Sequence, residues 1–272
     1  MKMMMATATL LAAVSCGSRA PKVLVLYYSQ NGGTKAVAEE IASRLGADLE
    51  EIVSLNPYDG DFQATIARCQ EEQKAGILPE VQPLKADLAA YDIVFLGYPV
   101  WFGTYAPPVG ALLGKIDLSG KKVVPFCTFG SGGLDSSTRD LVAAQPGAEV
   151  LPGYGVRAAR LDAVPAEVDQ FLKASGFLEG EYFQPDPFGE QQPVTEEEEA
   201  IFDAAVNGYP MFSGKASTVA SRALQDGVEY LFTALPLPRE GGPDAQLPPP
   251  SPMQVYVTAL EGQTPVFTQI VR

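Results

Sequence analysis

The sequence contains no histidine, one tryptophan and three cysteines in 272 residues. Without histidine, Ser–His and Cys–His catalytic pairs are excluded, and the commonest transition-metal ligand is missing. Basic residues are scarce as well: 19 Lys and Arg stand against 33 Asp and Glu, which gives a formal net charge of −14. This acidity argues against nucleic acid as a partner, because binding to phosphate backbones needs clustered positive charge.

Residues 22–34, KVLVLYYSQNGGT, are typical of a buried strand that runs into a short polar loop at the start of a helix. In such an element the backbone N–H groups and the positive end of the helix dipole converge on one point, which suits a phosphate group. The two glycines permit a close approach, and the hydroxyl and amide side chains can add hydrogen bonds. The alternative is an Asn-Gly turn that caps the helix without binding a ligand.

Two later segments repeat this form. Residues 91–103, YDIVFLGYPVWFG, place the tryptophan in a loop bounded by Pro99 and Gly103. Residues 121–133, KKVVPFCTFGSGG, end in another glycine-rich polar loop. Loops at the carboxyl ends of neighbouring parallel strands gather around one crevice. The three loops together therefore predict a site for a flat aromatic ligand with a phosphate tail.

These three loops resemble those of the flavodoxin family. SQNGGT resembles the phosphate loop, GYPVWFG the loop that places an aromatic ring on the flavin, and TFGSGG the loop at the flavin's far edge. The resemblance covers about residues 21–177 and implies a short-chain, doubly wound α/β domain. Its five-stranded parallel sheet would have the order 2-1-3-4-5, with FMN bound non-covalently. One departure is Gly33, where many relatives carry Asn; the backbone cradle is kept, but one side-chain contact to phosphate is lost.

The resemblance also implies which residues bind the cofactor. They are Ser29, Gln30, Asn31, Gly32, Gly33 and Thr34 at the phosphate, Pro99, Val100, Trp101, Phe102 and Gly103 in the aromatic loop, and Thr128, Phe129, Gly130, Ser131 and Gly132 in the third loop. Trp101 is expected to cover one face of the isoalloxazine ring, with an ordinary core tryptophan as the alternative. The third loop would line the pyrimidine edge through backbone contacts. No catalytic side chain and no metal site are expected.

The rest of the first 177 residues alternates between strand-like and helix-like patterns, as a parallel sheet covered by helices requires. We predict strands at residues 22–28, 48–53, 92–96, 122–126 and 149–151, and helices at residues 34–45, 62–75, 107–113, 134–144 and 165–174. Cys69 falls in a predicted helix and Cys127 ends a predicted strand. Both are interpreted as small buried apolar side chains rather than redox thiols.

The first 20 residues are interpreted as an export signal, not as part of the fold. A short positive start and an apolar stretch end in small residues at Ala13-Val-Ser-Cys16, which resembles a bacterial lipoprotein cleavage box. Cys16 would become the lipidated N-terminus, so the protein would be anchored in the cell envelope by lipid alone. The alternative is a plain signal peptide with Cys16 incidental.

The composition changes after residue 177. Residues 178–194 are rich in Pro, Gly, Gln and acidic residues and are predicted to be a linker. Residues 195–272 are predicted to be a small α+β domain. Thr195 and Glu198 form a capping-box pattern at the start of a helix, and two apolar runs around residues 261–264 predict a β-hairpin. The element order weakly resembles cystatin-like domains, although the inhibitory loop of that family is absent, so protease inhibition is not carried over.

Three functions from different classes follow. The first is an exported, membrane-anchored FMN electron carrier whose partners are redox proteins or a small quinone-like acceptor. The second is an FMN-dependent NAD(P)H:quinone or other small-molecule reductase, which would oxidise NAD(P)H in the steady state. The third is an interaction module that keeps the fold without the cofactor. Since a cofactor supplies the redox chemistry, the absence of histidine excludes neither of the first two.

Overall fold

The computed structural model describes residues 5–8, 19–58, 61–237 and 251–271. The chain divides into two compact units, residues 6–182 and residues 183–272 with the first five residues. We describe each unit by itself. The predicted lipidation site Cys16 lies outside the described residues. Over the ranges that are described, no helix is both long enough and apolar enough to span a membrane.

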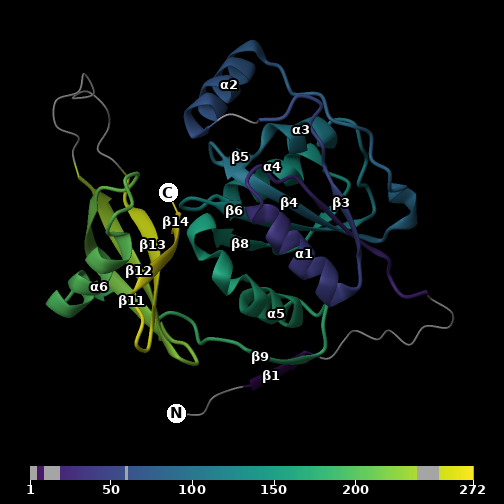
Figure 1. The fold of residues 1–272 in the computed structure, drawn as a ribbon. Coiled ribbons are helices and arrows are strands. Elements are labelled where there is room, and N and C mark those ends of the chain that lie inside the picture. The colour runs from purple at the N-terminus through teal and green to yellow at the C-terminus, as the bar shows by residue number, and fades with distance from the viewer. Residues whose placement is uncertain (1–4, 9–18, 59–60, 238–250, 272) are drawn as a thin grey trace. The chain divides into compact units, whose positions relative to one another are not determined.

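The N-terminal domain is built on a mainly parallel sheet (Figure 1). Its strands are β2 (Val23–Tyr27), β3 (Asp48–Glu51), β4 (Ile93–Trp101), β6 (Lys122–Phe129) and β7 (Glu149–Val150), in the spatial order β3-β2-β4-β6-β7. This confirms the predicted order 2-1-3-4-5. The fifth strand comes in two pieces, because β8 (Tyr154–Arg157) also pairs in parallel with β6. A short strand, β5 (Thr104–Tyr105), folds back antiparallel onto β4.

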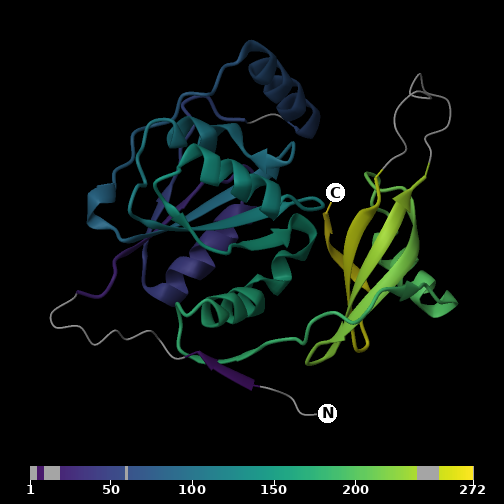
Figure 2. The ribbon, with the colours of Figure 1, turned by 180° about the vertical axis from the view of Figure 1, so that it is seen from behind.

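Helices cover both faces of this sheet (Figures 1 and 2). The apolar sides of α1 (Gly33–Leu45) and α5 (Val164–Ala174) pack with one face in a single core cluster. The other face packs against α2 (Phe62–Ala75), α3 (Pro107–Leu113) and α4 (Leu134–Ala144). Two 3-10 helices, η1 (Leu88–Ala90) and η2 (Ala158–Ala163), were not predicted. Cys69 and Cys127 are both free and fully buried, which confirms their interpretation as apolar core residues.

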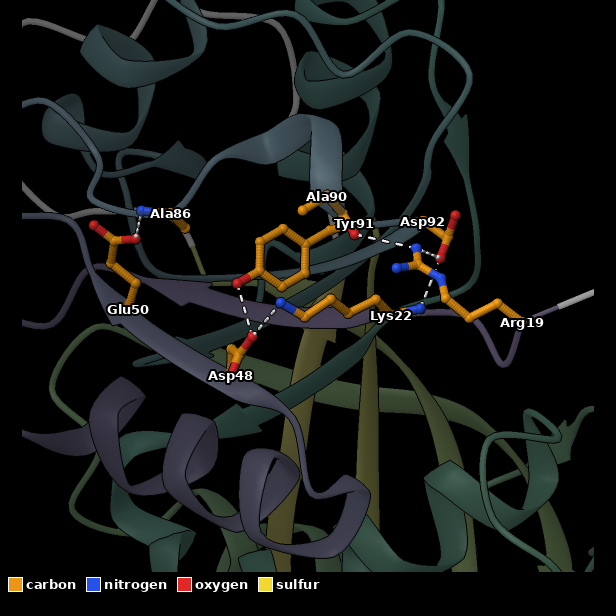
Figure 3. Close-up of polar contacts among 8 residues, drawn as sticks. All are labelled: Arg19, Lys22, Asp48, Glu50, Ala86, Ala90, Tyr91 and Asp92. Carbon is orange, nitrogen blue, oxygen red and sulfur yellow. Dashed lines mark hydrogen bonds and ion pairs between the residues drawn. The ribbon is translucent and has the colours of Figure 1, made fainter.

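A polar network fixes the starts of the first three parallel strands (Figure 3). Lys22 Nζ lies 3.0 Å from Asp48 Oδ2, and the Tyr91 hydroxyl donates to the same oxygen at 2.8 Å. The hydrogen bond from Lys22 lowers the pKa of Asp48, and Asp48 in turn raises the pKa of Lys22. The backbone N–H of Lys22 donates to Asp92 Oδ2 at 2.7 Å. The network lies at the amino ends of the strands, the edge opposite to the predicted cofactor loops.

The C-terminal domain is an antiparallel sheet with one helix, as predicted for an α+β module. The sheet has the order β10-β11-β12-β13-β14. Its elements are β10 (Gln192–Pro193), α6 (Glu196–Val206), β11 (Gly214–Ala223), β12 (Gly227–Pro236), β13 (Met253–Leu260) and β14 (Val266–Val271). Thr195 and Glu198 form the expected capping box at the start of α6. The predicted hairpin is present, with Thr258 paired to Val266.

The segment predicted as a linker, residues 178–194, contains two short strands. β10 extends the C-terminal sheet, and β9 (Gly180–Phe183) pairs with β1 (Met5–Ala8). Sequence composition missed both, because two to four residues of β structure leave no periodic pattern among prolines and acidic side chains.

Candidate functional site

The predicted cofactor loops meet at the carboxyl edge of the parallel sheet. Tyr27 is in register with Gly97, and Pro99 is in register with Thr128. The loops after β2, β4 and β6 therefore leave the sheet side by side. In an open α/β sheet this edge is where ligands bind.

The phosphate loop ends at the start of α1, where the first backbone N–H groups have no partner within the helix. Gly32 is the N-cap of α1 at φ +83°, a left-handed conformation that favours glycine. Its exposed position beside Asn31 leaves the first N–H groups of α1 open to a ligand. Inside the loop, Thr34 Oγ1 and Thr128 Oγ1 share a buried hydrogen bond of 2.8 Å. This contact joins the first and third loops directly.

Ser29 carries a buried hydroxyl beside the open start of α1. Its hydroxyl oxygen is buried, and among the described atoms it has no hydrogen-bond partner. A buried, unsatisfied hydroxyl is costly, and a ligand that accepts or donates a hydrogen bond there removes that cost. Together with the open N–H groups of α1, this hydroxyl fits the oxygen-rich end of a phosphate ester.

Gly33 faces a neighbouring side chain rather than open space. A Cβ built at this position would lie 3.3 Å from Leu161 Cδ1 and 3.9 Å from Thr128 Cγ2. Leu161 belongs to η2, which follows β8, and the end of its side chain would have to shift by a few tenths of an ångström to admit a Cβ at position 33. The glycine at position 33, where many relatives carry Asn, therefore goes together with a close Leu161 side chain.

The aromatic loop is a tight hairpin between β4 and β5. Trp101 pairs with Thr104, so the turn consists of Phe102 and Gly103, at φ +51° and +83°. Positive φ at both positions is the type I′ geometry that suits two-residue hairpins. The Trp101 ring is half-buried and meets the Tyr58 ring edge to face, with centroids 5.1 Å apart. Phe102 is 53% exposed at the tip.

The third loop is held from two sides. Arg157 Nε donates to the carbonyl oxygen of Gly130 at 2.9 Å, which brings a cation to a loop that contains none. A Cβ on Gly133, at φ +122°, would lie 2.5 Å from Val100 Cγ1, so this glycine lets the third loop approach the aromatic hairpin. Phe129 is buried in the core, whereas Gly130 is exposed and Ser131 and Gly132 are half-buried. At Phe129, therefore, a ligand can reach the backbone but not the side chain.

A fourth segment beside the three cofactor loops was not predicted from the sequence. The amide nitrogen of Gln30 donates to the Tyr58 carbonyl and to Thr65 Oγ1, each at 2.9 Å. Residues 54–58 and the start of α2 are thereby tied to the phosphate loop. No sequence signal marked Tyr58. Arg157 could have been found from the alternation that begins at Tyr154, which continues the fifth strand.

Burial keeps the reactive side chains near the site protonated. It raises the pKa of Tyr28 to about 12 and also raises the pKa of Tyr98. Complete burial raises the pKa of the Cys127 thiol well above its usual value, and burial raises that of Cys69 to about 11. A raised pKa disfavours the thiolate, which is the reactive form, at both cysteines.

A family model described as Flavodoxin matches residues 22–167. Among curated proteins, an NAD(P)H dehydrogenase (quinone) of Gluconacetobacter diazotrophicus is 32% identical over 35% of this chain and 53% of its own length. The chain thus spans about half the length of this curated relative.

Two solved structures are similar over the N-terminal domain. A flavoprotein of Lactobacillus acidophilus in complex with FMN is 29% identical, covering 57% of this chain and 100% of that one, with a TM-score of 0.46. A candidate flavoprotein of Bacteroides eggerthii is 28% identical, covering 57% and 99%, with a TM-score of 0.48. Because both scores lie below 0.5, the family assignment depends on the family model, which matches more than half of the chain.

Proposed function

The chain belongs to the flavodoxin family, and from this we propose that its N-terminal domain binds FMN and carries electrons on it. The observation that carries the proposal is the buried, unpartnered hydroxyl of Ser29 beside the open start of α1. The FMN complex of the similar Lactobacillus acidophilus flavoprotein supports the choice of cofactor.

The residues present fit the cofactor. The hydroxyls of Ser29 and Thr34 and the first N–H groups of α1 would bind the phosphate, which otherwise meets no cation in its loop. Trp101 and Phe102 would cover the ring, and the backbone of residues 128–132 would hold its pyrimidine edge. FMN supplies the redox chemistry when bound, because its ring accepts and releases electrons. The protein's own part is to hold the ring, to limit its contact with water and to set the charge around it.

Titration of the full chain with FMN tests the proposal. We expect saturable binding with quenched flavin fluorescence, weakened about tenfold or more in Thr34→Val, which removes one hydroxyl and keeps the shape. Thr268→Val in the C-terminal domain is the matched control and should bind as the wild type does. No binding at micromolar FMN would refute the proposal and leave the third function, a cofactor-free interaction module.

A second candidate is an FMN-dependent NAD(P)H:quinone reductase. It is favoured by the identity to the quinone dehydrogenase of Gluconacetobacter diazotrophicus over part of that protein. Steady-state oxidation of NADH or NADPH with a soluble quinone separates the two, since a carrier would be nearly inert in this assay.

We also propose that the protein is exported and held at the cell envelope through a lipid on Cys16. The support is the short apolar stretch that ends in Ala13-Val-Ser-Cys16. The acidic chain would attract basic redox proteins as partners. The C-terminal domain would bind a partner. Metabolic labelling with a radioactive fatty acid should mark the protein and should leave the Cys16→Ser variant unlabelled.

A further inference from the structure

The side chain of Gln30 makes contacts that a phosphate ligand would not require. Its amide nitrogen donates two hydrogen bonds to the segment after β3, one to the Tyr58 carbonyl and one to Thr65 Oγ1. An amide nitrogen has two hydrogens, so these contacts use its full donor capacity. The side chain of Gln30 therefore joins the phosphate loop to α2 instead of adding a donor at the phosphate.

Tyr58 is the point at which this connection reaches the aromatic loop. Tyr58 is 5% exposed, and Trp101 meets its ring edge to face at 5.1 Å, as it meets the ring of Tyr28 at 6.1 Å. The Arg68 guanidinium lies 3.8 Å from its centroid, and the Tyr58 hydroxyl donates to Glu72. Arg68 also donates to the Pro57 carbonyl at 2.8 Å. Tyr58 is thus held by a cation–π contact and hydrogen bonds, and it in turn limits the tilt of Trp101.

The helix that carries these contacts buries few of its side chains. Of the 14 residues of α2, only Thr65 and Cys69 are buried. Thr65 is itself the second acceptor of Gln30. Gln30 thus bonds to one of the two buried residues of α2, while Arg68 and Glu72 tie the same helix to Pro57 and Tyr58.

We propose that Gln30 and Tyr58 are positioning residues that act on the cofactor through Trp101. Gln30 fixes Tyr58, and Tyr58 fixes the ring of Trp101, so that the phosphate loop and the aromatic cover move as one unit. The proposal rests on FMN as the ligand, but it concerns residues that the ligand need not touch. It assigns α2 and residues 54–58 to the cofactor site, although they carry none of the three loop motifs.

A double-mutant cycle tests this path. Gln30→Met removes both donors and keeps the length of the side chain, and it should weaken FMN binding about tenfold, as the loss of two hydrogen bonds allows. In a Trp101→Ala background the same change should alter FMN affinity less than about twofold, because the residue through which Gln30 acts is gone. Equal losses in both backgrounds would show that Gln30 touches the cofactor directly and would overturn the proposal.

The tryptophan supplies a second readout that needs no cofactor. Since Trp101 is the only tryptophan in the chain, the emission of the FMN-free protein reports this one ring. Gln30→Met should shift Trp101 emission to longer wavelength and raise its quenching by acrylamide. Thr65→Val, which removes one acceptor of Gln30 outside the three loops, should act in the same direction and serves if Gln30→Met folds poorly.

Gln145→Met is the matched control. The Gln145 amide also donates two hydrogen bonds, here to the backbone carbonyls of Leu113 and Ile116, but it follows α4 at the opposite edge of the sheet. It should lower stability and leave Trp101 emission unchanged. If Gln30→Met and Gln145→Met alter the emission alike, the positioning role is wrong. If the wild type binds no FMN, the proposed function fails, and the emission of the FMN-free variants still decides whether Gln30 positions Trp101.

Discussion

Replacing Ser29 by alanine should have opposite effects on the stability of the FMN-free protein and on FMN affinity. The Ser29 hydroxyl is buried without a partner among the described atoms. Burying an unsatisfied polar group costs about 1–3 kcal/mol, so its removal should stabilise the FMN-free N-terminal domain by about 1 kcal/mol. For a domain of this size, that corresponds to a rise in Tm of about 2–4 °C.

FMN affinity should fall in the same variant. A hydrogen bond to a charged phosphate contributes about 1.5–3 kcal/mol, which corresponds to a loss of about 10- to 150-fold in affinity. Ligand binding stabilises the folded state in proportion to the logarithm of ligand concentration over Kd. The variant should therefore gain less stability from saturating FMN than the wild type does, and the order of the two Tm values should reverse.

Urea unfolding followed by Trp101 emission measures the first effect, because this single tryptophan reports the N-terminal domain alone. Ser137→Ala is the control: Ser137 is also a buried serine, but its hydroxyl donates to the Gly133 carbonyl at 2.6 Å and accepts from Tyr98 at 3.2 Å. It should destabilise the domain by about 1 kcal/mol. If Ser29→Ala also destabilises the FMN-free protein and leaves FMN affinity unchanged, the inference of a phosphate site from the orphaned hydroxyl is refuted.

Three further outcomes are expected. Gly97→Ala should destabilise the N-terminal domain by about 3 kcal/mol in urea unfolding, because a Cβ there would lie 2.1 Å from Phe126 Cζ. Asp48→Asn should lower stability at pH 7. Because Lys22 lowers the pKa of Asp48, the stability difference between this variant and the wild type should shrink as the pH falls below 3.8, the ordinary pKa of an aspartate. A stability difference that does not change at low pH would contradict the ion pair. Thr195→Ala should cost the C-terminal domain about 1 kcal/mol by circular dichroism without changing FMN affinity, because it removes a helix cap.

The fold of the N-terminal domain could be predicted because its local signals agree with one another. The bounds of α2, α3 and α4 are those predicted, since caps, prolines and glycines mark their ends. The fifth strand was only half predicted. The Pro152-Gly153 pair marks a break, but a Cβ on Gly153 would lie 2.3 Å from the Pro125 carbonyl. This glycine allows the chain to pass close to β6 and to pair again from Tyr154, and a close approach of two backbones leaves no periodic pattern in sequence.

The sequence predicted which loops form the site, but not the side-chain contacts that join them. Register places the loops after β2, β4 and β6 together, and that follows from a parallel sheet with this strand order. The bonds from Gln30 to Tyr58 and from Arg157 to Gly130 join residues 28 and 27 positions apart. Each depends on the rotamer of one side chain and on the path of an irregular segment. The place taken by Leu161 beside Gly33 depends likewise on η2, which has no strong periodic signal.

The acidity of the chain supports the proposed carrier over the proposed reductase. The cofactor loops themselves contain no charged side chain, and the whole chain has a formal net charge of −14. Negative charge near a bound cofactor raises the free energy of adding an electron, so a net negative field at the site would make bound FMN release electrons more readily. The same field repels NADH and NADPH, which are anions, whereas it attracts a basic redox protein. Arg157 is the one cation that a described hydrogen bond places on the third loop, and it therefore limits how far this field can lower the affinity of the cofactor for electrons.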